Sequence, residues 1–311
     1  MKIDNKHTGA PIQWRRAAAR AAVLLPLAQA VWALPLPPGE EEQRCWQRYT
    51  RERTQVNLRE PTAVDFSNLR DGDTVRSPLL VEFAVRGMGV EPAGMPVTGT
   101  GHHHILIDKP LPLNVQSPIP FDDQHRHFGK GQTSTVIDLK PGPHTLRLLF
   151  ADHEHRPYFV YSKQITVQVA GPRAGATLPK IDPARPEATC PAWYQEERSR
   201  PRPADEPLYI SNVRAGEALT SPFNLRLGVL ALGVCARGHC PEKNGHFSLE
   251  VLEAGSRRGV QAHDLVKGTT QINLFVPNGE YVLRLRLLDD RGQNMLPPHE
   301  LPVKVTGQQA L

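Results

Sequence analysis

An internal repeat constrains the fold of this chain more than any other feature of the sequence. Residues 64–90 align with residues 208–234 at an offset of 144 without a gap, and both segments contain Ser-Asn-x-Arg followed by Ser-Pro. The alignment resumes at an offset of 137, where residues 146–152 face residues 283–289. Such self-similarity predicts two copies of one domain. The change of offset gives the first copy seven extra residues before Gly131.

Each copy consists of short apolar or alternating runs that are separated by turns. Residues 80–85 and 225–230 are mainly apolar and of strand length, and residues 145–150 and 281–287 alternate after a Pro-Gly or Asn-Gly turn. The chain holds 30 Pro and 24 Gly, which suits short strands broken by turns. We therefore expect an all-β protein with two tandem Ig-like antiparallel β-sandwich repeats.

The composition outside the repeats predicts the rest of the domain organisation. Repeat one spans 64–170 and repeat two spans 208–306, and the segment between them, 171–207, is rich in Pro, Arg and Glu and is predicted to be a linker. Residues 34–63 form a lead-in segment before repeat one. Cys45-Trp46 in this segment is echoed by Cys190 and Trp193-Tyr194 before repeat two.

The N-terminus has the pattern of a signal peptide over residues 1–33. Five basic residues precede an uncharged, mostly apolar stretch, and small residues at Ala30 and Ala33 offer cleavage sites. No apolar stretch approaches the roughly 20 residues that span a bilayer. We therefore expect a periplasmic or secreted protein with no transmembrane span after cleavage.

The net charge gives no reason to expect a nucleic-acid partner. The whole chain has a formal net charge of +5, and residues 1–33 hold five Lys or Arg and one Asp, so their removal leaves about +1. A nucleic-acid-binding protein would need a basic stripe on its folded part.

Four cysteines in an exported chain favour disulfides over free thiols. Cys235 and Cys240 are expected to close a short local loop, and a metal site that includes His239 is the alternative. Cys45 and Cys190 are the other two cysteines. Three pairings of the four are possible, and the sequence does not choose among them.

Histidines gather in repeat one. Eight of the 13 His lie between residues 102 and 155, and six of them form three His-x-His pairs at 102/104, 125/127 and 153/155. Residues i and i+2 of a strand point to the same face, so one pair can present two imidazoles to one ion. Neutral imidazole suits zinc and copper.

The alignment with repeat two predicts which way each histidine of residues 102–104 points. Phe247 and Leu249 alternate as core residues, and their counterparts are His103 and Ile105. His103 is therefore predicted to be structural and to point inward, whereas His102 and His104 point the other way. Ser248 replaces His104 in repeat two and Tyr281 replaces His144, which predicts the same fold without the site. The predicted metal ligands are His102, His104, His127 and His155, with His125, His144, His153 and Asp152 as reserves.

Four motifs carry a resemblance to a known family. They are Gly101-His-His-His-Ile-Leu-Ile-Asp108, His127-Phe-Gly-Lys-Gly-Gln-Thr133, Pro141-Gly-Pro-His-Thr-Leu146 and Asp152-His-Glu-His155. Over roughly residues 64–170 the chain resembles family 4399 among the bacterial domains of unknown function. The resemblance implies an exported β-rich domain and implies no activity. Repeat two departs from the pattern at most histidine positions and resembles a degenerate copy.

The motifs do not favour an enzyme. The chain has no Gly-x-Ser-x-Gly, His-Glu-x-x-His or phosphate-loop motif, so no catalytic residue is predicted. A metal hydrolase built from the cluster would also need an open coordination position and a base. Two hypotheses remain. The first is a non-catalytic module that binds copper or zinc, and the second is a structural or protein-interaction module of the cell envelope with the histidines in internal hydrogen bonds.

Overall fold

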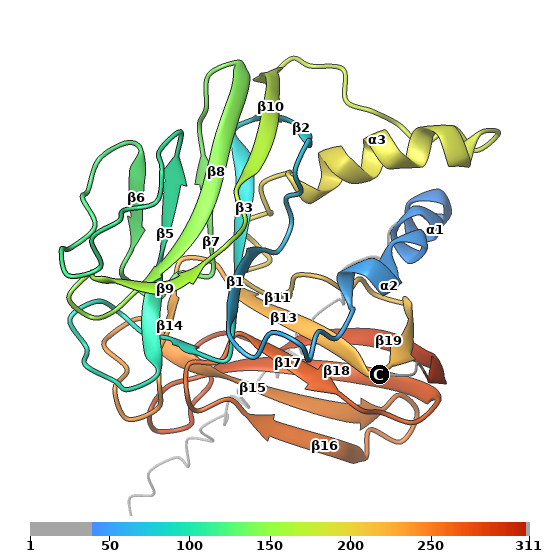
Figure 1. The fold of residues 1–311 in the computed structure, drawn as a ribbon. Coiled ribbons are helices and arrows are strands. Elements are labelled where there is room, and N and C mark those ends of the chain that lie inside the picture. The colour runs from blue at the N-terminus through green and yellow to red at the C-terminus, as the bar shows by residue number, and fades with distance from the viewer. Residues whose placement is uncertain (1–38, 309–311) are drawn as a thin grey trace, which may run out of the picture. The chain divides into compact units, whose positions relative to one another are not determined.

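The computed structural model describes residues 39–308, and the expected signal peptide lies outside them. Residues 63–172 form the first sandwich (Figure 1). Its smaller sheet has the strand order β1 (Ala63–Phe66), β3 (Leu79–Arg86), β7 (Ser134–Ile137). Its larger sheet has the order β2 (Thr74–Ser77), β10 (Ile165–Pro172), β8 (Gly142–Ala151), β5 (Thr100–Ile107), β4 (Gly89–Val90). Two further strands join this sheet, β6 (His125–Phe128) beside β5 and β9 (Pro157–Tyr161) beside β8.

The second sandwich repeats this topology. Its smaller sheet has the order β11 (Leu208–Ile210), β13 (Phe223–Val229), β17 (Gln271–Leu274). Its larger sheet has the order β12 (Ala218–Ser221), β19 (His299–Gln308), β18 (Gly279–Leu288), β15 (Asn244–Glu253), β14 (Gly233–Val234), with β16 (Gly259–Asp264) beside β15. Only β9 has no counterpart among the described strands. The prediction of two tandem Ig-like sandwiches is confirmed.

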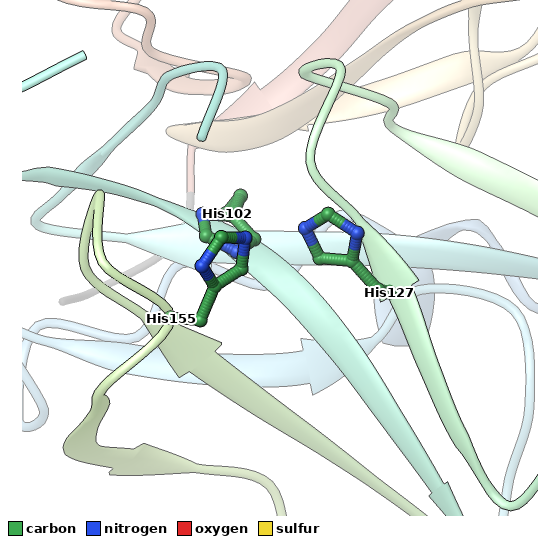
Figure 2. Close-up of side chains that lie close together, drawn as sticks. All are labelled: His102, His127 and His155. Atoms are coloured by element: carbon green, nitrogen blue, oxygen red, sulfur yellow. The ribbon is translucent and has the colours of Figure 1, made fainter. Parts of the chain in front are cut away.

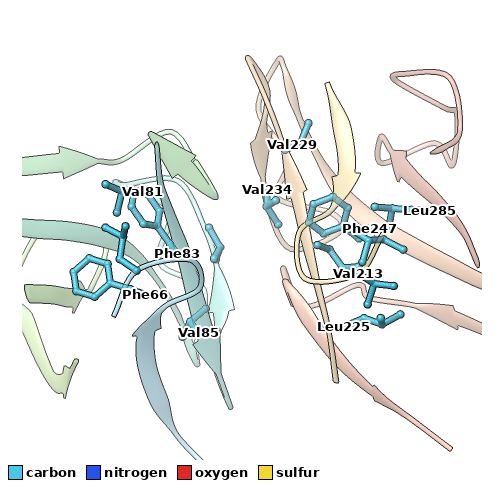
Figure 3. Packing of buried hydrophobic residues seen from close by; sticks show 14 of the residues in the cluster. Phe66, Val81, Phe83, Val85, Val213, Leu225, Val229, Val234, Phe247 and Leu285 are labelled. Carbon is cyan, nitrogen blue, oxygen red and sulfur yellow. The ribbon is translucent and has the colours of Figure 1, made fainter. Parts of the chain in front are cut away.

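Apolar side chains from the facing sheets fill each sandwich. On β3, Val81, Phe83 and Val85 are at most 5% exposed, and Figure 3 shows them beside Phe66 of β1. In the second sandwich Leu225, Phe247 and Leu285 are fully buried in the same way. The alternation that predicted these strands therefore reflects one face turned to a hydrophobic core.

Two glycines at matching positions of the repeats, Gly131 and Gly268, lie where the two copies meet. The Val90 N–H donates to the Gly268 carbonyl at 2.8 Å, and the Val234 N–H donates to the Gly131 carbonyl at 2.8 Å. Gly131 and Gly268 have φ of +74° and +71°, and a Cβ on either would lie 2.2 Å from a backbone oxygen of the other copy. Both positions therefore require glycine. These reciprocal bonds lie within one compact unit of the chain.

The lead-in and linker segments form helices that the sequence did not predict. Helices α1 (Glu40–Arg48) and α2 (Thr50–Arg53) lie in the lead-in segment, and α3 (Pro186–Arg198) lies in the segment expected to be a linker. A disulfide joins Cys45 of α1 to Cys190 of α3, and the second disulfide joins Cys235 to Cys240. No helix within residues 39–308 is long and apolar enough to cross a membrane.

A long loop covers the outer face of the larger sheet in the first sandwich. Residues 108–124 connect β5 to β6 and contain the extra residues of repeat one. Ile119 of this loop is 3% exposed and packs with Leu106, Leu149 and Ala151 on the sheet face opposite the main core. This cover adds a third layer above β5, and it determines the environment of the histidines.

Candidate metal centre

Strand β5 places three consecutive histidines in two different environments. His103 is 1% exposed, and its ring centroid lies 4.9 Å from those of Phe83 and Phe150 in the main core. His102 and His104 point to the opposite face, as the strand alternation requires. Both are nevertheless 0% exposed, because the outer face of the sheet is covered. The alternation of the strand predicted which way these rings point but did not predict their burial.

Pairing between strands brings the third histidine to the same face. In the antiparallel register of β5 and β6, His127 lies opposite His104, and their ring centroids are 5.0 Å apart. Gly129 leaves room for this imidazole, because a Cβ there would lie 2.2 Å from His127 Cε1 and Nε2. The His-Phe-Gly segment of the sequence motif thus serves to position one ring.

The turn between β8 and β9 supplies the fourth histidine. The Asp152 carboxylate accepts the backbone N–H groups of Glu154 and Arg156 at 2.9 and 2.8 Å, which holds the turn. Within this turn His155 adopts a φ of +66°, which is uncommon for a residue other than glycine. Asp152, a predicted reserve ligand, therefore has a visible role in shaping the turn.

Three imidazoles converge on one point (Figure 2). One ring nitrogen from each of His102, His127 and His155 lies within 4.8 Å of the other two, and this is the one such ligand group found in residues 39–308. His104 lies alongside, with its Nε2 3.1 Å from His102 Nε2. Zinc–nitrogen bonds of about 2.0–2.1 Å would bring ligand nitrogens to roughly 3–4 Å from one another. Small side-chain rotations would close the present set onto an ion.

The electrostatics of the cluster favour neutral rings. Burial, together with the neighbouring histidines, lowers the pKa of His102 to about 3 and that of His104 to about 2. Burial and His155 lower the pKa of His127 to about 4. A neutral imidazole has a free lone pair, which is the form that binds a metal.

Several ring nitrogens in the cluster lack a hydrogen-bond partner. Among the described residues, His102 Nδ1, His104 Nδ1 and His127 Nε2 are buried and unpaired. Buried polar atoms without partners are costly and rare in native proteins. A metal ion would satisfy such nitrogens, so the donor set fits a zinc or copper ion.

The reserve histidines lie in other arrangements. His125 Nδ1 contacts the Asp122 carboxylate at 2.9 Å, and His144 Nδ1 contacts Asp108 Oδ2 at 2.7 Å. His153 lies in the same turn as His155 and does not belong to the converging group. The carboxylate partners of His125 and His144 lie outside the strands that carry these histidines, so the sequence pattern did not predict that these histidines lie outside the cluster.

Phe121 belongs to the site and was missed by the sequence analysis. Its ring centroid lies 4.5 Å from that of His127 and 5.0 Å from that of His155, and the residue is 59% exposed. It therefore lies between the imidazoles and solvent. The signal that could have found it is an aromatic residue within the histidine-rich insertion.

The second sandwich has one buried histidine where the first has its cluster. His246, the counterpart of His102, is 0% exposed, and its Nε2 lies 3.0 Å from Asp264 Oδ1 on β16. Ser248 occupies the position of His104 on β15. The converging imidazoles are thus confined to the first sandwich within the described part of the chain.

Comparisons with known proteins give a family match and distant structural similarities. No curated protein sequence matches the chain. The fibronectin(III)-like modules of Clostridium thermocellum CbhA are 8% identical, cover 78% of this chain and 94% of theirs, and superpose with a TM-score of 0.21. The two fibronectin type-III domain segment from chicken tenascin is 11% identical, covers 78% of this chain and 98% of its own, and has a TM-score of 0.21. CopC from Methylosinus trichosporium OB3b is 16% identical, covers 33% of this chain and 96% of its own, and also has a TM-score of 0.21.

The histidine motifs and the family comparison concern the same part of the chain. The matched segment runs from β3 to β10 and contains all four converging or adjacent histidines. The resemblance predicted from these motifs is confirmed, since residues 81–170 match the family described as a domain of unknown function (DUF4399).

Proposed function

We propose that the chain is an exported, non-catalytic binding protein whose first sandwich binds one copper or zinc ion through His102, His127 and His155. One observation supports this proposal most directly: three imidazoles from three separate segments converge within 4.8 Å. Side-chain packing alone does not explain this convergence, because the cluster contains buried ring nitrogens that lack hydrogen-bond partners. His104 is the fourth nitrogen donor, beside His102.

The expected metal preference follows from the ligand type. Imidazole suits both ions, and affinity for a given nitrogen site rises toward copper and falls again at zinc in the Irving–Williams order. The site should therefore bind Cu(II) more tightly than Zn(II). The two disulfides suit an oxidising compartment, such as the periplasm or the exterior of the cell.

Titration calorimetry of the full chain with Cu(II) and Zn(II) tests the proposal. His127→Ala and His155→Ala should each lower the affinity by at least about tenfold, since each removes one ligand. His125→Ala is the matched control, because it removes a half-buried histidine that contacts Asp122 instead of the cluster. Equal affinity in the wild type and both ligand variants would exclude the proposed site.

The second candidate function is that of a structural or protein-interaction module of the cell envelope. Its support is the ring packing within the cluster, where His102 and His155 meet edge to face at 5.1 Å. In that case the histidines would stabilise the covering loop without an ion. Metal addition would then leave the thermal unfolding of the protein unchanged, whereas a bound ion raises the unfolding temperature.

A further inference from the structure

A cavity lies where the helices meet the two sandwiches. It has a volume of about 370 Å³ and is lined by α1, α3, the segment 200–203, and strands of both copies. Its volume falls in the range of about 300–1,000 Å³ that is typical of small-molecule sites. The proposed metal ligands lie elsewhere, so this cavity has no part in the function proposed above.

The charged lining of this cavity consists of five arginines and four glutamates, namely Arg53, Arg198, Arg200, Arg202 and Arg214 with Glu42, Glu82, Glu197 and Glu206. Arg202 pairs with Glu82 at 2.8 Å, and Arg53 forms a buried ion pair with Glu217. Arg214 has no ion pair among the described residues. Its Nη1 donates to the backbone carbonyls of Ser211 and Val213 at 2.9 and 3.3 Å. Among these three arginines, Arg214 is therefore the one without a direct ion pair, although Glu82 and Glu217 lie near enough to favour its charge.

The surroundings of Arg214 make its charge costly in the absence of an anion. Burial, together with the nearby Arg202 and Arg53, lowers the pKa of Arg214 to about 10, while Glu82 and Glu217 act in the opposite direction. Arg198 also lines the cavity, and its Nη2 donates to Asp73, but its Nε and Nη1 are buried without a hydrogen-bond partner. An incoming anion would offset the repulsion and accept free N–H donors.

Aromatic rings hold the guanidinium groups in place. Arg214 Cζ lies 4.1 Å from the centroid of Trp46, and Arg53 Cζ lies 4.7 Å from the same ring. Stacking fixes the plane of a guanidinium while its edge stays free to bind a carboxylate by two parallel bonds. Leu80 and Leu301 add apolar wall to the same cavity. The lining suits a ligand with one carboxylate and an apolar body.

From this arrangement we infer that the cavity binds a small organic carboxylate, with Arg214 as the residue that binds the carboxylate group. The guanidinium of Arg214, which has no direct ion pair, attracts the anion, and the apolar wall excludes water around the remainder of the ligand. The site is independent of the metal centre, so either one can fail its test without affecting the other.

Calorimetric titration of the full chain with benzoate tests this inference. Benzoate should bind at one site with a Kd below about 1 mM. Benzamide, which has the same shape without the charge, should bind at least about tenfold more weakly. Arg214→Gln should weaken benzoate binding by at least about tenfold, the usual effect of losing a charge-assisted hydrogen bond. Arg59→Gln removes an exposed arginine charge and should leave the affinity unchanged.

Arg214→Lys keeps the test decisive if Arg214→Gln does not fold. Lysine retains the charge but lacks the planar guanidinium that binds a carboxylate by two parallel hydrogen bonds, so benzoate binding should be weaker than in the wild type. Circular dichroism checks that each variant is folded. The inference is overturned if benzoate shows no saturable binding, if benzamide binds equally well, or if folded Arg214 variants bind benzoate as the wild type does.

Discussion

Replacing His103 by Leu isolates the contribution of one buried imidazole to acid stability. His103 is 1% exposed, and burial lowers its pKa to about 3 from the ordinary value of 6.5. Because the folded-state pKa lies below the unfolded value, the unfolded chain takes up the proton first. The stability contribution is complete above pH 6.5 and is lost as the pH falls from 6.5 toward 3. Between pH 7 and pH 5 this loss is about 2 kcal/mol.

Urea denaturation at pH 7 and pH 5, without metal, measures this difference. The free energy of unfolding should fall by about 2 kcal/mol less in His103→Leu than in the wild type. Other groups also titrate in this range. Burial raises the pKa of Glu91 to about 7, which contributes the opposite sign, but such effects cancel in the comparison of the two proteins. The same pH dependence in both proteins would show that burial does not lower the pKa of His103.

Two further predictions concern the cover of the site and the cross-link between the helices. Phe121→Ala should change stability by no more than about 1 kcal/mol, since the ring is 59% exposed. It should accelerate loss of metal to a chelator, measured by stopped-flow mixing, and an unchanged rate would show that the ring does not cover the ion. Replacing Cys45 and Cys190 by Ser should lower the free energy of unfolding by about 2–5 kcal/mol in urea, because the disulfide closes a loop of 145 residues. A change below 1 kcal/mol would mean that α1 and α3 hold together without it.

The sequence predicted the sandwiches because their physical basis is local and repeated. Alternating apolar residues such as Phe247 and Leu249 mark one core face of a strand, and the gap-free alignment transferred that assignment to His103. The change of offset likewise placed seven extra residues in repeat one before Gly131. These inferences needed only periodicity and register, which a single sequence contains.

Other features depended on contacts between distant segments. The burial of His102 and His104 results from a covering loop, and the alternation of a strand carries no information about such a cover. Helix α3 was not predicted, because its Pro-rich flanks favoured a linker and its apolar partners lie on α1. The roles of Asp122 and Asp108 as partners of reserve histidines also became visible only in three dimensions.

X-ray absorption of the full chain loaded with one equivalent of Zn(II) shows which atoms bind the ion. We expect three or four nitrogen ligands at about 2.0–2.1 Å, with the outer-shell scattering that imidazole rings produce. His127→Ala should lose one imidazole from this shell. A first shell of oxygen atoms without imidazole scattering, or a spectrum that is unchanged by His127→Ala, would contradict the claim that the converging histidines bind the ion.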